Sequence, residues 1–389
     1  MQGKSKKIVK NSAALYVRMA FTMLISLYTS RVLLSALGIN DYGIYNVVGG
    51  IVALFSFLSA AMSLSVSRFL GIAMGQNKGD ELVRVFKASL NIHICIAFVI
   101  ALLAEFGGVW YLHHYINVPP DRLPATFIVL HTSVLILMLN VIRVPYIAAI
   151  NISEDINIYA IFTVIESCLK LVIVYILYFS KVDRLVLYGY LMLLITAIMS
   201  LFYYIYSKHH YVWCKFQFFW DRRLYYKLVR FATFNIFGNM VQMAVNQGQN
   251  LLLNFMFGPV VNAARGVAFQ VDAAMKGFVV NIFTAVNPQL FKSYGEQNYD
   301  YMKVLLYNSA RLSFAVLLMV SIPIILDIDY ILNLWLKEVP EHTASFIVLL
   351  LINSLVFANM QPLMLAIHAT ARIGKLHVYT GLVNLLSNR

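Results

Sequence analysis

The amino-acid sequence predicts an all-α, polytopic membrane protein, and its composition, its long apolar segments and the placement of its basic residues all indicate that class. Of the 389 residues, 61% are apolar and 12% are charged, whereas soluble domains have roughly 45–50% apolar and about 25% charged residues. A soluble globular protein is therefore excluded. At ~20 apolar residues for each crossing of a bilayer, the chain is long enough for about a dozen transmembrane helices.

Apolar stretches of spanning length recur along the whole chain. Their unbroken length predicts helices rather than the strands of a barrel. The apolar run of the first stretch is too long for a secretory signal and lacks a small-residue cleavage site, so we predict an uncleaved first helix. We expect an eleventh segment to start near residue 376, after ten at 12–37, 43–70, 88–112, 124–147, 156–179, 184–207, 229–257, 260–287, 304–326 and 344–367.

The lysines and arginines are distributed unevenly between the predicted connections. If the N-terminus is cytoplasmic, the inner connections hold seventeen of them and the outer connections four, which satisfies the positive-inside rule strongly. The stretch 208–230 alone holds six, and we interpret it as the boundary between two halves. We therefore predict an N-terminal six-helix lobe at 1–207, a cytoplasmic linker at 208–228 and a C-terminal lobe at 229–389.

An internal repeat with a shift of 220 residues supports this division. The segment Gly75-Gln76-Asn77-(x2)-Asp80 corresponds to Gly295-Glu296-Gln297-(x2)-Asp300 without a gap. An even number of helices separates the copies, which predicts two lobes of the same orientation around a central cavity, an architecture typical of transporters. The second copy stops inside its fifth helix at Arg389, so we expect an incomplete second lobe, either because the chain is truncated or because its natural end lies elsewhere.

Charged and amide side chains in the predicted helices are the candidate binding groups, since charge at bilayer depth is costly. Arg265, Asp272 and Lys276 are seven and four residues apart and therefore share one stripe of a helix. The first copy of the repeat has no charge at the matching positions, so packing of the scaffold explains them poorly. The preceding helix carries a stripe of amides, and we predict a hydrated cavity there, lined by Asn246, Gln249 and Asn250 among others.

Further charged residues lie in the predicted helices of the first half. Arg18 and Arg31 in the first helix add basic groups, which at cavity depth favour an anionic ligand. Glu166 and Lys170 are four residues apart and either neutralise each other or act in ion coupling, a role that is open to Asp272 as well. Three arginines near the cytoplasmic ends of their helices are expected to extend to the interface, namely Arg68, Arg143 and Arg311.

Several classes of function are disfavoured by the sequence. The net charge of +13 is dispersed between apolar stretches, unlike the clustered basic surface of a nucleic-acid-binding protein. The three cysteines show neither metal-ligand spacing nor a pairing pattern, and no GxxxxGK[ST], HExxH or GxSxG motif occurs. Asp327 and Asp329 could mimic the metal-binding carboxylates of a membrane glycosyltransferase, although a solvated helix end explains them better. We expect neither an enzyme nor a cofactor, a metal or a nucleic-acid partner.

Two segments resemble a known family. They are Ser30-Arg31-Val32-Leu33-Leu34-Ser35-Ala36-Leu37-Gly38, followed by Asp41-Tyr42-Gly43-Ile44-Tyr45, and Val261-Asn262-Ala263-Ala264-Arg265-Gly266-Val267-Ala268. In these segments the chain resembles bacterial polysaccharide flippases of the multidrug/oligosaccharidyl-lipid/polysaccharide exporter superfamily. The resemblance implies two six-helix lobes that move an undecaprenyl-diphosphate-linked oligosaccharide across the bacterial inner membrane by alternating access.

The same resemblance implies the partners and the binding residues. The expected partners are the lipid-linked oligosaccharide, the lipid bilayer and membrane proteins of O-antigen, capsule or exopolysaccharide assembly. Arg18, Arg31 and Arg265 occupy helices whose arginines are thought to meet the diphosphate in such flippases, and Lys276 joins them as a candidate. Two alternatives stay open, a cation-coupled multidrug exporter of the same superfamily and, with less support, a membrane glycosyltransferase or polymerase.

Overall fold

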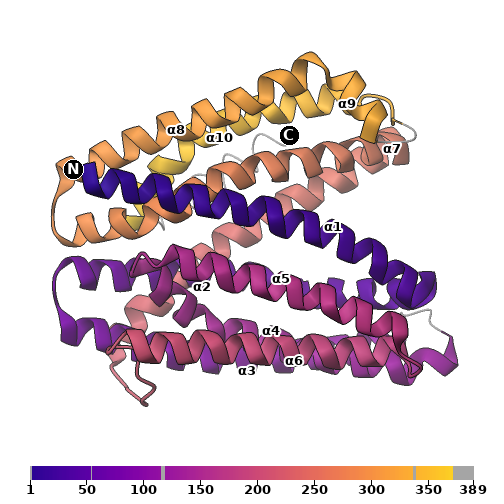
Figure 1. The fold of residues 1–389 in the computed structure, drawn as a ribbon, viewed down its shortest axis with the longest axis horizontal. Helices are drawn as coiled ribbons and strands as arrows, with labels where there is room; N and C mark the ends of the chain where they lie inside the picture. Colours follow the sequence, from indigo (N-terminus) through magenta and orange to yellow (C-terminus); the bar gives the residue numbers. More distant parts are fainter. Residues whose placement is uncertain (1, 54, 115–118, 336–338, 371–389) are drawn as a thin grey trace. The chain divides into compact units, whose positions relative to one another are not determined.

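A computed structural model describes residues 2–53, 55–114, 119–335 and 339–370 (Figure 1). Side chains are outside the description at 2–14, 241–260 and scattered positions of the first two helices and of α7, and the predicted eleventh segment also lies outside it. Within the described residues the elements are helical throughout. They are α1 (Gln2–Ala53), α2 (Ser56–Gly75), α3 (Gly79–His114), the short 3₁₀ helix η1 (Pro120–Arg122), α4 (Leu123–Ile152), α5 (Ile156–Phe179), α6 (Arg184–His210), α7 (Arg222–Gly295), α8 (Tyr299–Leu326), α9 (Ile328–Trp335) and α10 (Thr343–Thr370).

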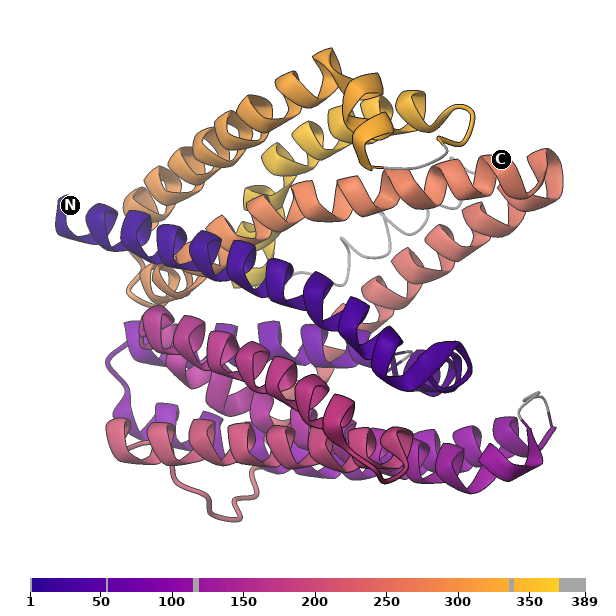
Figure 2. The same cartoon turned by 45° about the vertical axis from the view of Figure 1, so that its right-hand side comes forward.

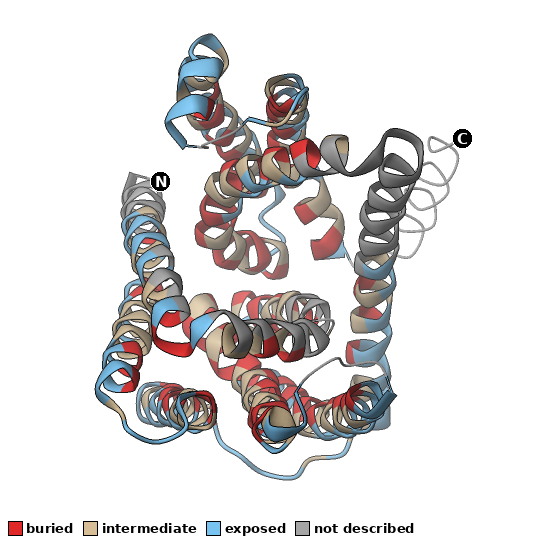
Figure 3. Ribbon diagram, turned by 90° about the vertical axis from the view of Figure 1, so that its right-hand side faces the viewer, coloured by how far each residue is buried: buried red, intermediate tan, exposed pale blue. Residues whose placement is uncertain are grey.

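Seven helical segments of the described residues are long and apolar enough to cross a membrane. Six of them contain the predicted segments 88–112, 124–147, 156–179, 184–207, 304–326 and 344–367, and the seventh is Ala264–Gly295. Large apolar side chains on these helices are exposed, including Phe106 at 74% and Phe179 at 80%. Figure 3 shows the exposed faces beside the buried ones. An apolar face open to the surroundings suits contact with lipid, which confirms the predicted class of polytopic all-α membrane protein.

The helix boundaries differ from the predicted ones in two places. The predicted end of the first segment at residue 37 is real, because Gly38 breaks α1 with φ 77° and ψ 170°, a conformation open essentially to glycine alone. The helix resumes beyond this break, however, and the predicted segment 43–70 is divided between the end of α1 and the start of α2. The predicted segments 229–257 and 260–287 both lie in α7, which turns back on itself (Figure 2).

The chain divides into two compact units, which we call the N-terminal unit (residues 13–232) and the C-terminal unit (residues 1–12 with 233–389). In the N-terminal unit α4 packs against α2, α3, α5 and α6. Two close approaches depend on small residues, because a Cβ at Gly108 would lie 2.7 Å from Leu130 and one at Gly189 would lie 2.8 Å from Thr132. In the C-terminal unit α8 packs against α10. The predicted lobe boundaries at 207 and 229 stay a prediction.

The internal repeat is visible in the backbone of two turns, one in each unit. After α2, the amide of Gln76 donates to Ile72, that of Asn77 to Met74 and that of Lys78 to Ala73. After α7, the same three hydrogen bonds recur 220 residues later, from Glu296, Gln297 and Asn298 to Lys292, Tyr294 and Ser293. The central residues, Asn77 and Gln297, both have positive φ, at 54° and 59°. The matching geometry supports two copies of one structural unit.

Candidate functional site

A cavity in the described N-terminal unit has a volume of about 590 Å³ and lies among α1, α5 and α6. Both parts of α1 line it: Thr29 lies before the break at Gly38 and Tyr42 lies after it. Apolar side chains such as Met19 and Met192 complete the lining. Its polar lining residues are Thr22, Ser26, Thr29, Tyr42, Tyr45, Ser167, Lys170 and Tyr188.

Two contacts hold α1 against α6 beside this cavity, one on each side of the break at Gly38. Arg184, the first residue of α6, donates from Nη1 to the backbone oxygen of Ala36 at 2.9 Å. That carbonyl lies just before the break at Gly38, where an α-helix leaves carbonyls without partners within the helix. Beyond the break, the rings of Tyr45 and Tyr188 meet edge to face with centroids 5.0 Å apart. The bent course of α1, and with it the cavity, is therefore fixed by α6.

A charged cluster joins Arg122 to α1 and to the start of α6. Arg122 forms salt bridges to Asp41 of α1 and, at 2.6 Å, to Asp183 at the start of α6. Asp183 also caps α6 by accepting hydrogen bonds from the backbone amides of Leu185 and Val186 at 3.0 and 3.2 Å. Burial alone would raise the pKa of Asp183, but the two amides and Arg122 outweigh it and lower that pKa. The carboxylate therefore stays charged at neutral pH.

A second charged cluster lies between α4 and α5, on the edge of the cavity. Glu166 accepts from Lys170 at 2.8 Å and from Arg143 at 3.1 Å, while Arg143 also donates to Asn140 at 2.9 Å. The predicted pairing of Glu166 with Lys170 is confirmed. The prediction that Arg143 extends to the interface is wrong, because its acidic partner on the next helix holds it inside the bundle with only 13% of the side chain exposed.

Other predicted basic residues of the first half are placed as follows. Arg18 lies over the ring of Tyr159, with its guanidinium carbon 5.1 Å from the ring centroid. Arg68 is 6% exposed and lies over Phe69 and Phe231, so the expectation that it reaches the interface is also wrong. Stacking on aromatic rings provides a favourable site for a guanidinium. Arg311, by contrast, is exposed.

The predicted charged stripe of the C-terminal unit is present in α7. Lys276 donates to Asp272 at 2.7 Å, and Ser354 of α10 donates to the other oxygen of the same carboxylate. Arg265 is buried, at 5% exposed, and lies 4.2 Å from the centroid of the Phe269 ring. The side chains of four other candidates fall outside the described residues, namely Arg31, Asn246, Gln249 and Asn250.

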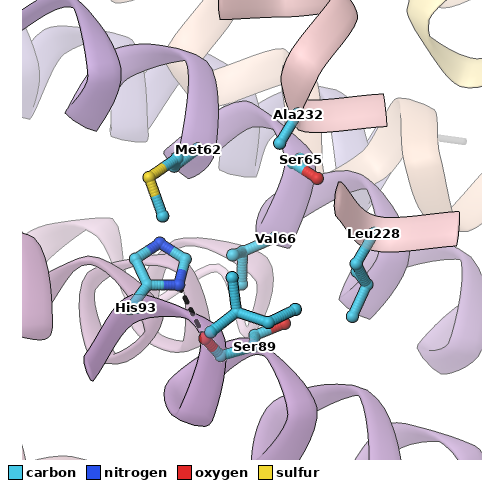
Figure 4. Close-up of a pocket in the computed structure, with 8 residues that line it drawn as sticks. Met62, Ser65, Val66, Ser89, His93, Leu228 and Ala232 are labelled. Carbon is cyan, nitrogen blue, oxygen red and sulfur yellow. Dashed lines mark hydrogen bonds between the residues drawn. The ribbon is translucent and has the colours of Figure 1, made fainter. Parts of the chain in front are cut away.

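A much smaller cavity, of about 10 Å³, lies among α2, α3 and the start of α7 (Figure 4). His93 contacts the backbone oxygen of Ser89 through Nδ1 at 2.7 Å. Its Nε2 and the hydroxyl of Ser89 are buried without a hydrogen-bond partner among the described atoms. A space of this size accommodates about one water molecule and excludes any larger ligand. Elsewhere in the described chain, no group of three histidine, cysteine or acidic residues is placed to bind a metal.

Sequence reasoning missed part of the larger site. Arg143 is separated from Glu166 by 23 residues, and Tyr188 from Tyr45 by far more, so neither contact follows from helical spacing. The tyrosines were also hidden by their abundance, since the chain contains 24 of them. The signal that was available, hydroxyl residues at helical spacing in the first helix, does mark the wall of the cavity through Thr22, Ser26 and Thr29.

Solved structures of MATE and MOP-superfamily transporters share the fold of this chain. A crystal structure of a MATE mutant superposes with a TM-score of 0.84 and 16% sequence identity, covering 98% of this chain and 86% of that chain. An outward-facing multidrug resistance MATE family transporter of the MOP superfamily gives 0.81 and 16%, with 97% and 85% covered. A MOP superfamily transporter from Pyrococcus furiosus, described as having a binding pocket of reverse polarity, gives 0.79 and 16%, with 97% and 85% covered. At this identity the likenesses show the fold alone.

The family is shown by the sequence itself. Residues 8–294, most of the chain, match the model of the family described as "Polysaccharide biosynthesis protein", and the chain belongs to that family. Comparison with curated proteins gives no match.

Proposed function

We propose that this protein is a flippase that moves undecaprenyl-diphosphate-linked oligosaccharide units across the bacterial inner membrane by alternating access. The product would serve assembly of a surface polysaccharide such as O-antigen or capsule. Membership of the polysaccharide biosynthesis family supports this role. The transporter fold supports movement of a cargo rather than its synthesis.

The observation that carries the proposal is the charge within the membrane-spanning helices. In the N-terminal unit one carboxylate, Glu166, serves the two cations Arg143 and Lys170. In α7 of the C-terminal unit, Arg265 and Lys276 accompany the single carboxylate of Asp272. Each set holds two basic side chains and one acidic side chain, and basic side chains bind a diphosphate or another anionic group of a cargo through charge-assisted hydrogen bonds.

The same observation bears on the second candidate, a cation-coupled multidrug exporter. Such a protein needs carboxylates that are open to an organic cation. Glu166 and Asp272 already accept hydrogen bonds from lysines of their own helices, at 2.8 and 2.7 Å. A drug cation would have to displace these partners, so an anionic cargo fits the charges better.

Export by arginine variants tests the proposal. In a bacterial strain that depends on this protein for surface polysaccharide, we expect Arg265→Ala and Arg18→Ala each to abolish export while the protein level in the membrane stays near normal. The guanidinium of Arg265 lies over the ring of Phe269, and that of Arg18 lies over the ring of Tyr159. Arg311→Ala, at an exposed position, is the control and should support export. Normal export by both test variants would overturn the role assigned to these arginines.

Binding separates the two candidates directly. Purified protein in nanodiscs should bind a polyprenyl-diphosphate-linked disaccharide, and an organic cation such as ethidium should not compete. Displacement of the disaccharide by the cation, or binding of the cation alone, would favour the exporter.

The proposed orientation has a cytoplasmic N-terminus and places the connection at 211–221 in the cytoplasm. Phe218 in this connection is 77% exposed, so a cysteine there can react with a thiol reagent. With Cys95, Cys168 and Cys214 replaced by serine, Phe218→Cys should react with a membrane-impermeant maleimide only after the membrane is opened. Labelling from outside intact spheroplasts would reverse the orientation.

A further inference from the structure

We propose that the cavity of the N-terminal unit binds an acidic sugar of the cargo, which makes the protein selective for oligosaccharides that carry a carboxylate. This inference rests on the proposed flippase function. It assigns to the cavity a role separate from binding of the diphosphate. The ligand class follows from the charge, the hydroxyl groups and the size of the cavity.

The charge comes from Lys170, the one charged side chain among the described residues of the lining. The side chain of Lys170 is 38% exposed, whereas that of Glu166 beside it is only 16% exposed. Because Arg143 holds the second oxygen of that carboxylate, Glu166 balances only one of its two cations. A carboxylate entering the cavity would meet the remaining positive charge and would form a charge-assisted hydrogen bond with Lys170.

The remaining polar lining suits a sugar. Seven of the thirteen lining residues carry a hydroxyl group, contributed by α1 on both sides of Gly38, by α5 and by α6. A hydroxyl can both donate and accept, as can each hydroxyl of a sugar ring. Tyr45 and Tyr188 add ring surfaces, with their planes at 78° to one another, and such rings combine an apolar face with a polar tip.

The size and the polar lining of the cavity argue against binding of the other parts of the cargo there. About 590 Å³ lies in the range of sites that enclose a small ligand, roughly 300–1,000 Å³, and is too small for a whole oligosaccharide with its lipid. A polyprenyl chain would leave Lys170 and the hydroxyl groups without partners, which is costly in an apolar surrounding. The diphosphate is the one alternative anion, and the experiment separates it from the sugar.

The test compares two ligands on the same polyprenyl diphosphate, a disaccharide ending in glucuronate and one ending in glucose. We expect the full chain in nanodiscs to bind the glucuronate form about tenfold more tightly. Lys170→Met should reduce this ratio to about one by weakening glucuronate binding, and Lys170→Arg, which keeps the charge, should retain most of it. Lys303→Met is the matched control, because Lys303 also pairs with a carboxylate of its own helix but is 76% exposed, and the ratio should stay near tenfold.

Each outcome decides a different claim. A ratio near one in the wild-type protein overturns the acidic-sugar site and leaves the flippase function standing. Equal loss of both ligands in Lys170→Met assigns Lys170 to the diphosphate and also overturns the site. If neither ligand binds the wild-type protein, the proposed function itself is wrong. Size-exclusion profiles and circular dichroism of each variant show whether it is folded, and Lys170→Arg keeps the test decisive if Lys170→Met is not.

Discussion

Glu166 of α5 pairs with Arg143 of α4 and with Lys170 of its own helix. Its charge therefore links α4 to α5. Glu166→Gln would leave Arg143 and Lys170 facing each other around a neutral amide. Removing one partner of a buried ion pair typically costs about 3–5 kcal/mol, so we expect a clearly lower melting temperature in detergent. The double variant Glu166→Gln with Arg143→Gln should recover part of the loss, because the partners are coupled. A single variant as stable as the wild type would show that the cluster contributes nothing.

In the cluster of Arg122 with Asp41 and Asp183, the carboxylate of Asp183 should make the stability of the protein depend on pH. Its pKa is lowered in the folded protein, against the opposing effect of burial, by the amides of α6 and by Arg122. A depressed pKa contributes stability that is present above the ordinary value near 3.8 and is lost as the pH falls through the folded value. The melting temperature should therefore decline below about pH 4.

The matched variant for this prediction is Asp183→Asn, which can still cap α6 but carries no charge. We expect it to melt lower than the wild type at pH 7 and to show a smaller decline in acid. Parallel curves for the two proteins between pH 7 and pH 3 would assign the acid sensitivity to other carboxylates.

Whether a side-chain contact can be predicted from the sequence depends on how many residues separate its two partners. The pairs Glu166–Lys170 and Asp272–Lys276 are four residues apart on one helix, so helical geometry alone brings them together. Arg143 and Arg122 find their acids 23 and 81 residues away. Their contacts depend on which helices are neighbours, and a single sequence carries no local signal for that.

At the scale of the helix, the break in α1 depends on the backbone of Gly38. Gly38→Ala would place a side chain where φ is 77°, at a cost of about 1–3 kcal/mol. No atom lies within 4 Å of the added Cβ, so the loss in melting temperature would report backbone strain alone. Gly107→Ala in α3, equally uncrowded but in ordinary helical conformation, should instead gain about 0.5–1 kcal/mol. The same response in both variants would contradict a special backbone at Gly38.

Hydropathy predicted most helices because each span is a continuous apolar run bounded by polar turns. It failed where the helix and the apolar run do not coincide. The division of 43–70 between α1 and α2 occurs inside an apolar stretch, and α7 continues through two predicted segments. The length of an apolar run indicates how many residues of the chain lie in the bilayer, whereas the ends of a helix are set by backbone hydrogen bonds. The two boundaries therefore need not agree.

At the scale of the whole molecule, the two copies of the repeat provide an internal comparison. The equivalent turns place Asn77 at φ 54° and Gln297 at φ 59°. Left-handed conformation costs most residues about 1–2 kcal/mol, and asparagine adopts it more readily. Gln297→Gly should therefore raise the melting temperature, while Asn77→Gly should leave it almost unchanged. A larger gain from Asn77→Gly would contradict the equivalence of the two turns.

The shared carboxylate between α4 and α5 also bears on how the chain enters the bilayer during synthesis. A charged side chain near the middle of a helix costs about 2.5–3.5 kcal/mol on insertion scales. Lys170 and Glu166 neutralise each other within α5, but Arg143 of α4 meets its acid only in the next helix. The two helices are joined by residues 153–155 alone. The translocon should therefore release α4 efficiently only as a hairpin with α5, and nascent chains ending at residue 155 should integrate α4 less completely than chains ending at residue 180 in a glycosylation-mapping assay.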